Sequence, residues 1–291
     1  MDEYCRRYAL QDNKRELPAK QLILHKEKKV AFCYVPKSAC TTFKILLLHS
    51  QGMLPDQYLE YDKRKQPYVA PKLRKILLKA LDSQERESVV KNYFKFVMFR
   101  HPLERLLSGY RSKMSVAVKS EEKMTDDNDR DVEGDILLFD KEVLILHAYP
   151  DKYLKWKAAH ESYPINITFS DFIDYWVKSE SLSQNAHFNS VLRLCRPCTV
   201  HYDYYGNFKT FWSDSKLLMD KIGASEDELR PQYPKPSDEL VNEYYGQLTD
   251  DQKLKVLRKL APELKFYYML FPPEKDTHKY ILGIDANIFN L

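Results

Sequence analysis

The chain has 291 residues, of which 44% are hydrophobic and 30% are charged, so it can form a globular protein with a large buried core. Its formal net charge of +4 fits an anionic ligand but is too small for the strong basic stripe expected of a nucleic-acid-binding protein. Only 7 glycines beside 21 tyrosines argue against a low-complexity protein. The sequence contains no run of about 18 apolar residues, which is the length that would predict a membrane span.

The first predicted unit is a strand, a loop and a helix. The run Val30–Val35 is apolar, β-branched and aromatic, which predicts a buried strand. Pro36 ends this strand because proline cannot donate to a sheet, and a helix is predicted from about Thr41 to His49. The loop between them carries Lys37, hydroxyl groups and free backbone N–H groups, which predicts an anion site. The loop has no glycine of the Walker type, and an ordinary turn with a surface lysine is the alternative.

A second strand and helix follow two short predicted helices, at Pro71–Leu81 and Ser83–Lys91. Tyr93–Phe99 predicts a second buried strand. A helix is predicted directly beyond it, from Pro102 to Lys113, because proline suits the first turn of a helix. The polar side chains that can face a ligand here are Arg100, Ser108, Arg111 and Lys113. A solvated basic helix is the alternative.

The rest of the chain alternates helices with short strands. Residues 115–135 are acidic and polar and predict an exposed loop, and the prolines at 230–237 predict another. The other predicted elements are a helix Ile136–His147, a strand Ile165–Phe169, a helix Asp171–Val177 capped by Ser170, a strand Thr199–Asp203, a helix that ends before Gly223, and a helix that begins at the capping box of Thr249 and Gln252 and runs to Leu260. The alternation predicts one α/β domain, residues 1–291 with a core at about 28–272, with a mostly parallel central sheet flanked by helices.

The cysteines do not form a disulfide framework that can be read from the sequence. There are five, at positions 5, 33, 40, 195 and 198, which leaves one odd cysteine and does not settle the redox compartment. Cys195 and Cys198 form a single CxxC pair, which is half of a zinc site, and no other cluster has a metal-ligand spacing. No metal is therefore expected. Asn166 begins a glycosylation sequon.

Two anion sites, each after a strand, suggest a ligand with two separated phosphate groups. This arrangement resembles the sulfotransferases that use 3′-phosphoadenosine 5′-phosphosulfate (PAPS). Pro36–Lys44 is similar to their 5′-phosphosulfate loop, and Arg100–Lys113 is similar to their 3′-phosphate motif. The segments His187–Phe188, Leu194–Cys198 and Tyr202–Phe208 narrow the resemblance to the Golgi carbohydrate sulfotransferases. That group modifies chondroitin, dermatan, terminal N-acetylgalactosamine and the natural-killer-epitope glycan.

The resemblance implies a P-loop-like sulfotransferase fold and an enzyme that transfers sulfate from PAPS to a glycan hydroxyl without a metal. It implies that the phosphosulfate is held by Pro36, Lys37, Ser38, Ala39, Cys40, Thr41 and Thr42, and the 3′-phosphate by Arg100 and Ser108, with Arg111 as a further cofactor-binding residue. The expected partner is a glycosaminoglycan or glycoprotein sugar, with no nucleic acid. The resemblance also implies a Golgi lumen address with cysteines at least partly oxidised, and membrane attachment only through an N-terminal anchor that this sequence does not contain.

Three positions depart from the family pattern: Phe188 stands where relatives have tryptophan, Tyr68 where many have histidine, and Lys209 where glutamate is common. The catalytic candidates are Lys37, His187 and Tyr68. His187 is favoured as the general base because the pKa of a free histidine is about 6.5, whereas that of a free tyrosine is about 10. His187 could instead bind the acceptor or the nearby cysteine turn. A glycan-binding protein that has lost turnover and, less favoured, a nucleotide kinase are the alternative functions.

Overall fold

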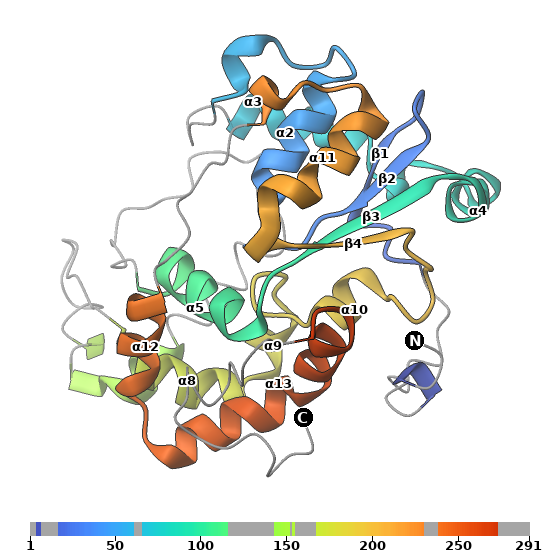
Figure 1. Ribbon diagram of the computed structural model, residues 1–291. Helices are drawn as coiled ribbons and strands as arrows, with labels where there is room; N and C mark the ends of the chain where they lie inside the picture. The colour runs from blue at the N-terminus through green and yellow to red at the C-terminus, as the bar shows by residue number, and fades with distance from the viewer. Residues whose placement is uncertain are drawn as a thin grey trace. The chain divides into compact units, whose positions relative to one another are not determined.

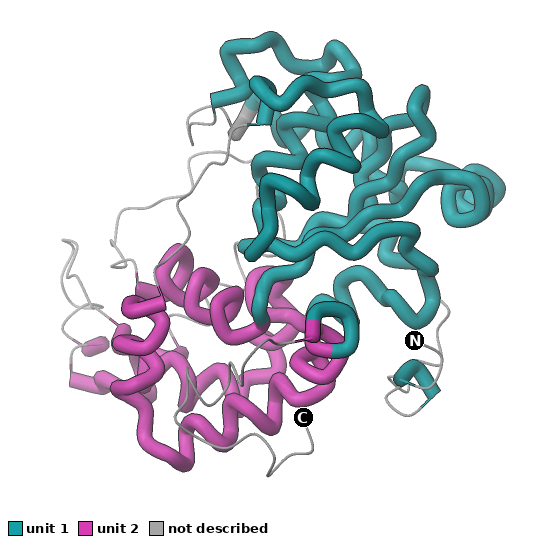
Figure 2. Tube along the Cα trace, in the orientation of Figure 1, with its two compact units in different colours: residues 1–101, 191–235, 269–271 teal, residues 102–190, 236–268, 272–291 magenta. Residues whose placement is uncertain are grey.

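The computed structural model describes residues 4–6, 17–60, 66–115, 143–151, 153–154, 167–229 and 238–272 (Figure 1). The chain divides into two compact units (Figure 2). Unit 1 comprises residues 1–101, 191–235 and 269–271, and unit 2 comprises residues 102–190, 236–268 and 272–291. The predicted organisation as a single domain stays a prediction.

Unit 1 is built on a four-stranded sheet with the strand order β1-β2-β3-β4. The strands are β1 (Leu22–His25), β2 (Val30–Cys33), β3 (Phe94–Phe99) and β4 (Tyr204–Asn207). β1 pairs with β2 in the antiparallel sense, whereas β2 with β3 and β3 with β4 are parallel (Figure 1). The α/β class and the mostly parallel sheet are therefore confirmed.

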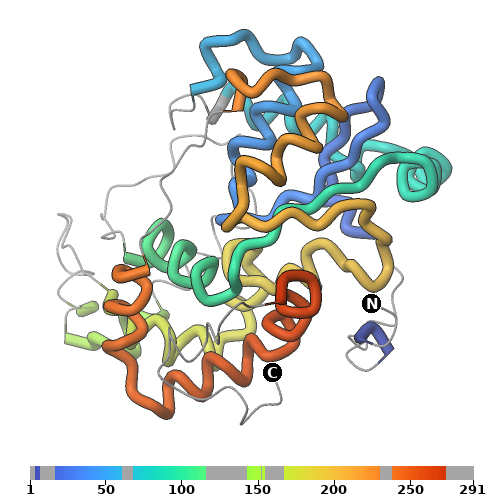
Figure 3. Tube along the Cα trace, in the orientation of Figure 1, coloured from blue at the N-terminus to red at the C-terminus, as the bar shows by residue number. Residues whose placement is uncertain are grey.

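Helices flank this sheet, as predicted. They are α2 (Cys40–His49), α3 (Gln66–Lys75), α4 (Ser83–Asn92), α10 (Val191–Cys195) and α11 (Phe211–Ile222), with 3-10 turns η1 (Asp56–Tyr58), η3 (Leu78–Ala80), η4 (Phe208–Thr210) and η5 (Glu226–Glu228). Figure 3 shows α2 and α11 side by side although they are far apart in the sequence. The Phe43 ring of α2 contacts both the sheet and α11: its centroid lies 4.9 Å from that of Phe32 in β2 and 5.7 Å from that of Phe211 in α11. Aromatic burial of this kind holds the helices on the sheet.

Unit 2 consists of helices in its described parts. They include α5 (Pro102–Lys113), α8 (Phe169–Lys178), α9 (Glu180–Gln184), α12 (Asp238–Gly246) and most of α13 (Asp250–Leu270). Two buried tyrosines tie α5 to its neighbours: Tyr245 donates to the carbonyl of Leu103 at 2.9 Å, and Tyr110 donates to that of Ile167 at 2.6 Å. Burial raises the pKa of Tyr110 to about 12, so its hydroxyl keeps the proton that it donates.

Several predicted boundaries are confirmed by their capping residues. Gly223 ends α11 with a φ of 72°, a left-handed conformation that favours glycine. Thr249 and Gln252 form the predicted capping box, with bonds of 3.0 and 3.2 Å between side chain and backbone. The helix that they begin continues ten residues past the predicted end at Leu260, because Leu264, Phe266 and other residues beyond Pro262 are buried.

Two predicted strands differ from the described residues. Residues 167–169 of the strand predicted at Ile165–Phe169 are not in a strand and lead into α8, because Thr168 caps that helix by accepting the N–H of Asp171 at 3.2 Å. Ser170, the predicted cap, lies inside the helix. The strand predicted at Thr199–Asp203 begins only at Tyr204, because the Asp203 carboxylate accepts the N–H of Lys95 at 2.7 Å before the strand pairing starts.

Other predictions differ in extent. The helix predicted at Pro71–Leu81 is α3 followed by η3, because Leu77 takes an extended conformation and bridges to Ile23 of the unpredicted strand β1. Residues 143–147 of the helix predicted at Ile136–His147 are helical, and the helix continues through residue 148. The rest of that helix, the loop predicted at 115–135 beyond Ser115, the loop at 230–237 and the sequon residue Asn166 lie outside the described residues. No helix within the described ranges is long and apolar enough to span a membrane.

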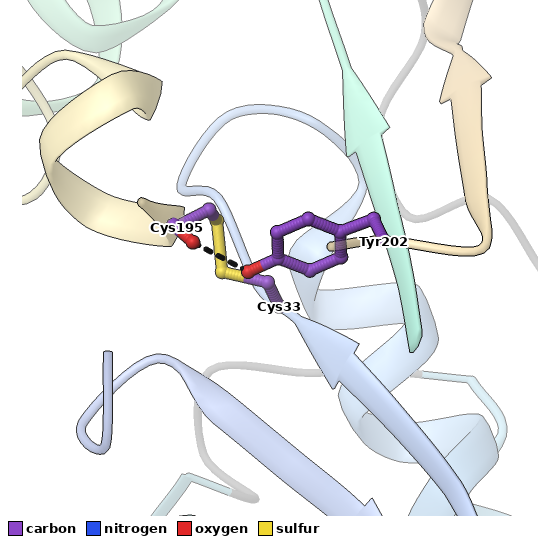
Figure 4. Close-up of a disulfide and its surroundings, with 3 residues drawn as sticks. All are labelled: Cys33, Cys195 and Tyr202. Atoms are coloured by element: carbon purple, nitrogen blue, oxygen red, sulfur yellow. Dashed lines mark hydrogen bonds between the residues drawn. A yellow bond between two sulfur atoms is a disulfide. The ribbon is translucent and has the colours of Figure 1, made fainter. Parts of the chain in front are cut away.

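Two disulfides join distant parts of unit 1, Cys5–Cys198 and Cys33–Cys195. This confirms the expectation of oxidised cysteines, and it leaves neither sulfur of the CxxC pair as a thiolate ligand for a metal. Figure 4 shows Tyr202 beside the second disulfide, where its hydroxyl donates to the Cys195 carbonyl at 2.6 Å. Burial raises the pKa of Tyr202 well above its ordinary value.

Removal of the Cys33–Cys195 disulfide is expected to lower stability strongly. The bond closes a sequence separation of 162 residues, so its loss in Cys33→Ala/Cys195→Ala releases much chain entropy in the unfolded state. We expect the free energy of unfolding to fall by about 2–5 kcal/mol, measured by urea denaturation. Cys40→Ser is the control, because Cys40 is a free thiol. Equal midpoints for both variants would contradict the prediction.

Candidate active site

The loop after β2 turns sharply into α2 without any glycine. Lys37 has a φ of 72°, and Ala39, the N-cap of α2, has a φ of 57° and a ψ of 21°. A left-handed conformation costs a non-glycine residue roughly 1–2 kcal/mol. Such residues turn successive N–H groups toward one side, which makes a concave site for an anion. The absence of Walker glycines therefore does not prevent the loop Pro36–Thr42 from binding an anion, and we call this segment the anion loop.

Ser38 lies between these two residues and gives a second indication of a ligand. Its side chain is fully buried, and its Oγ has no hydrogen-bond partner among the described residues. A buried hydroxyl without a partner costs about 1–3 kcal/mol. The N-terminus of α2 also receives no hydrogen bond from the side chain of its cap, Ala39. A phosphate oxygen would satisfy both groups, so the residues present fit the predicted phosphosulfate.

Arg100 lies just past the end of β3 and contacts the same loop. It is 4% exposed, and its Nη1 donates to the Lys37 carbonyl at 3.1 Å. Its guanidinium carbon lies 4.7 Å from the centre of the Phe208 ring. The structure thus brings Lys37 and Arg100 together within unit 1, with a cation held in a fixed direction beside the anion loop.

Ser108 and Arg111 lie on α5, in unit 2. They are three residues apart and so share one face of the helix. Ser108 is half-buried, and Arg111 is exposed. Their predicted association with Arg100 on one phosphate group stays a prediction.

His187 lies in the loop that follows α9, and its ring is oriented by Asn185. The Asn185 side-chain oxygen accepts the backbone N–H of His187 at 3.0 Å and lies 3.0 Å from His187 Nδ1. A backbone N–H can only donate, so the atom that it meets must be the amide oxygen, which only accepts. Nδ1 therefore carries the hydrogen in the neutral ring, and Nε2 has the free electron pair. This tautomer suits a general base that acts through Nε2.

The loop with His187 packs closely on α5 at Gly109. A Cβ atom at Gly109 would lie 2.8 Å from Phe188 Cε1 and 3.2 Å from the His187 carbonyl oxygen. Phe188, which stands where the family pattern has tryptophan, is buried, and its ring centroid lies 5.2 Å from that of Phe172. Gly109 is therefore required by the approach of the loop and not by backbone conformation.

Tyr68 lies on α3 with its side chain 44% exposed. Its ring stacks on Tyr58 with 4.7 Å between centroids, and Lys72 Nζ lies 4.4 Å from the ring centre. These contacts engage the ring and do not orient the hydroxyl. The role of Tyr68 as a rival base stays a prediction.

Two residues that contact the His187 backbone were not among the predicted site residues. Asn185 is two residues before His187, a spacing typical of side chains that bond their own backbone. Arg105 interrupts the apolar stripe of α5, where a charged residue is unexpected. Within the described ranges, no group of three His, Cys, Asp or Glu side chains could hold a metal ion.

Comparison with known proteins identifies the family. The model described as "Sulfotransferase family" matches residues 20–268. The chain belongs to the sulfotransferase family. Carbohydrate sulfotransferase 14 of Danio rerio is 26% identical over 282 residues, covering 94% of this chain and 68% of the relative. Carbohydrate sulfotransferase 11 of the same species is 24% identical over 287 residues (92% and 72%), and carbohydrate sulfotransferase 9 of Homo sapiens is 25% identical over 289 residues (92% and 56%). No solved structure matches.

These findings confirm the family resemblance and the sulfotransferase fold. In this sulfotransferase, the loop Pro36–Thr42 and Arg100 are the parts of the candidate site that lie within unit 1. Ser108, Arg111 and His187 are the parts that lie within unit 2.

Gly109→Ala is expected to disturb the His187 loop. The added Cβ meets Phe188 at 2.8 Å, so the loop or α5 must move. We expect a loss of about 1–3 kcal/mol in the free energy of unfolding and reduced transfer activity. The control is Gly246→Ala on α12, where a Cβ meets nothing within 4 Å and helix propensity favours alanine. If the two variants unfold at the same temperature, the His187 loop does not pack against Gly109 as closely as described.

Proposed function

We propose that this sulfotransferase transfers the sulfuryl group of PAPS to a hydroxyl of a glycan, in a glycosaminoglycan or a glycoprotein sugar. The observation that carries the proposal is the anion loop with its buried, unsatisfied Ser38 hydroxyl and adjacent Arg100, in a chain of this family. The names of the relatives as carbohydrate sulfotransferases support a sugar as acceptor.

The negatively charged groups of PAPS would be held by cationic side chains and by hydrogen-bond donors. Lys37 and the N–H groups of residues 38–42 would bind the phosphosulfate, and Arg100, Ser108 and Arg111 would bind the 3′-phosphate. PAPS supplies the sulfuryl group when it is bound. A nucleotide kinase is less well supported, because it needs a glycine-rich loop that Pro36–Thr42 does not provide.

The reaction then needs a base and a group that offsets negative charge. His187 Nε2 accepts the proton of the acceptor hydroxyl, and the hydroxyl oxygen forms a new bond to sulfur. The bond between sulfur and the bridging phosphate oxygen breaks, which releases adenosine 3′,5′-bisphosphate. Lys37 offsets the charge that develops on that bridging oxygen, which lowers the barrier. No metal is needed for any of these steps.

We also infer that the protein works in the Golgi lumen. The two disulfides support this inference, because such bonds persist in oxidising compartments. A fully reduced protein recovered from cytosol would contradict it.

The decisive experiment is sulfate transfer from labelled PAPS across a panel of desulfated glycosaminoglycans and N-glycan termini. We expect label in at least one glycan. Calorimetry with adenosine 3′,5′-bisphosphate against ATP tests the donor separately, and tight binding of the bisphosphate without transfer to any glycan would indicate a binding protein. Preference for ATP would indicate a kinase.

Lys37→Ala is expected to reduce kcat by about 100–1,000-fold, because Lys37 meets charge that develops only in the transition state. Ser108→Ala should mainly raise the KM for PAPS, because the 3′-phosphate does not react. Steady-state kinetics separate the two effects. Lys91→Ala, at an exposed lysine of α4, is the control for loss of a positive charge. A near-normal kcat in Lys37→Ala would mean that this loop is wrongly assigned.

The pH–rate profile tests His187 as the base. The base must be unprotonated, so activity should rise with pH along an acidic limb at about pH 6–7. In His187→Ala this limb should disappear together with most of kcat, whereas Tyr68→Phe should keep both. The opposite pair of results would assign the base to Tyr68 and leave His187 as part of the scaffold.

A further inference from the structure

Arg105 is a charged residue on the buried face of α5. It is 3% exposed and lies among the buried leucines Leu103, Leu106 and Leu107. A guanidinium keeps its charge in proteins, so its burial is unfavourable unless other groups satisfy it. The groups that Arg105 contacts therefore show what the protein gains from this position.

Arg105 holds two carbonyl groups of the loop that carries His187. Its Nη2 donates to the Asn189 carbonyl at 2.6 Å, and its Nη1 donates to the His187 carbonyl at 3.4 Å. The planar fork of an arginine can hold two acceptors at once in a fixed geometry, which a lysine cannot do. The Nη1 bond reaches the backbone of the proposed base, and the shorter Nη2 bond holds the loop two residues further on.

Glu263 of α13 supplies the opposite charge. Its Oε1 lies 3.4 Å from Arg105 Nη2, and the side chain is 2% exposed. Neither carboxylate oxygen of Glu263 has a hydrogen-bond partner among the described residues, and neither does Arg105 Nε. A buried pair with unsatisfied atoms contributes little to stability compared with apolar side chains of the same volume. The arginine of this pair is the one that holds the two loop carbonyls.

The backbone of His187 is thus held at both of its polar groups. Asn185 accepts its N–H, and Arg105 donates to its carbonyl. Gly109, one turn further along α5 from Arg105, allows the same carbonyl to lie against the helix. With the backbone and Nδ1 fixed, the direction of Nε2 is defined.

We propose that Arg105, paired with Glu263, is a positioning residue that orients His187 for proton transfer. This inference rests on the proposed role of His187 as the general base. Misplacement of a reacting group by about 1 Å can reduce a rate on the order of 100-fold. The pair should therefore affect kcat and not the binding of the donor.

The test compares Arg105→Lys and Glu263→Gln with the control Tyr245→Phe, which removes another buried hydrogen bond to α5 without touching the loop. We expect kcat to fall by about 10–100-fold in the first two variants and to stay normal in the control. The affinity for adenosine 3′,5′-bisphosphate, measured by calorimetry, should stay within about 3-fold of wild type in all three. The acidic limb of the pH–rate profile should persist, at a lower plateau, because the base is still present.

A double-mutant cycle then separates positioning from a general loss of structure. In the His187→Ala background, Arg105→Lys should change kcat by less than about 2-fold, because no base remains to be oriented. Two results would overturn the positioning role and leave the base assignment intact. One is a normal kcat in both Arg105→Lys and Glu263→Gln. The other is a double mutant with His187→Ala whose loss of kcat equals the product of the two single losses. If Arg105→Lys does not fold, Glu263→Gln carries the same test.

Normal turnover by His187→Ala would be a different result. It would remove the base assignment itself, and the positioning role with it. Absence of transfer from PAPS by the wild-type protein would count against the proposed function as a whole.

Discussion

The parallel pairing of β2 with β3 is the constraint on which the anion site depends. Cys33 pairs with Val97, so the chain leaves both strands at the same edge of the sheet. Ligands of open α/β sheets bind at this edge, outside the carboxyl ends of the strands. Arg100 consequently reaches the carbonyl of Lys37, 63 residues away in the sequence. β4, parallel to β3, adds Phe208 just beyond its own end, under the Arg100 guanidinium.

The anion loop keeps its shape through its attachments and not through flexible residues. Lys37 and Ala39 take left-handed conformations that glycine would adopt without strain. Such conformations persist where the surroundings fix the backbone from several sides. Here Cys33 is bonded to Cys195 just before the loop, Arg100 holds the Lys37 carbonyl, and buried residues of α2 anchor its far end. The backbone of the loop is therefore held in one conformation from both of its ends.

Local chemistry predicted the strands β2 and β3 and several helix ends, whereas tertiary contacts decided the rest. The apolar runs at Val30 and Phe94 and the capping residues Thr249 and Gln252 act within a few positions, so a sequence shows them. The four-residue strand β1 depends on its pairing with β2. β4 begins one residue later than the predicted strand ends, because the Asp203 side chain accepts the N–H of Lys95. Arg105 and Glu263 are 158 positions apart, so neither residue alone indicates the pair. Their partners become visible only when the helices are packed.

The pairing of Arg105 with a carboxylate also matters for the chemistry of the proposed base. Arg105 brings a positive charge to the backbone of the His187 loop, where it donates to the His187 and Asn189 carbonyls. Proton transfer requires that the ring accept such a charge. Glu263 balances Arg105, so the pair can fix the geometry of the loop while it adds little net charge. Asn185, which is neutral, orients Nδ1 without adding charge either. In the proposed mechanism the loop is therefore positioned by groups that add little net charge beside the proposed base.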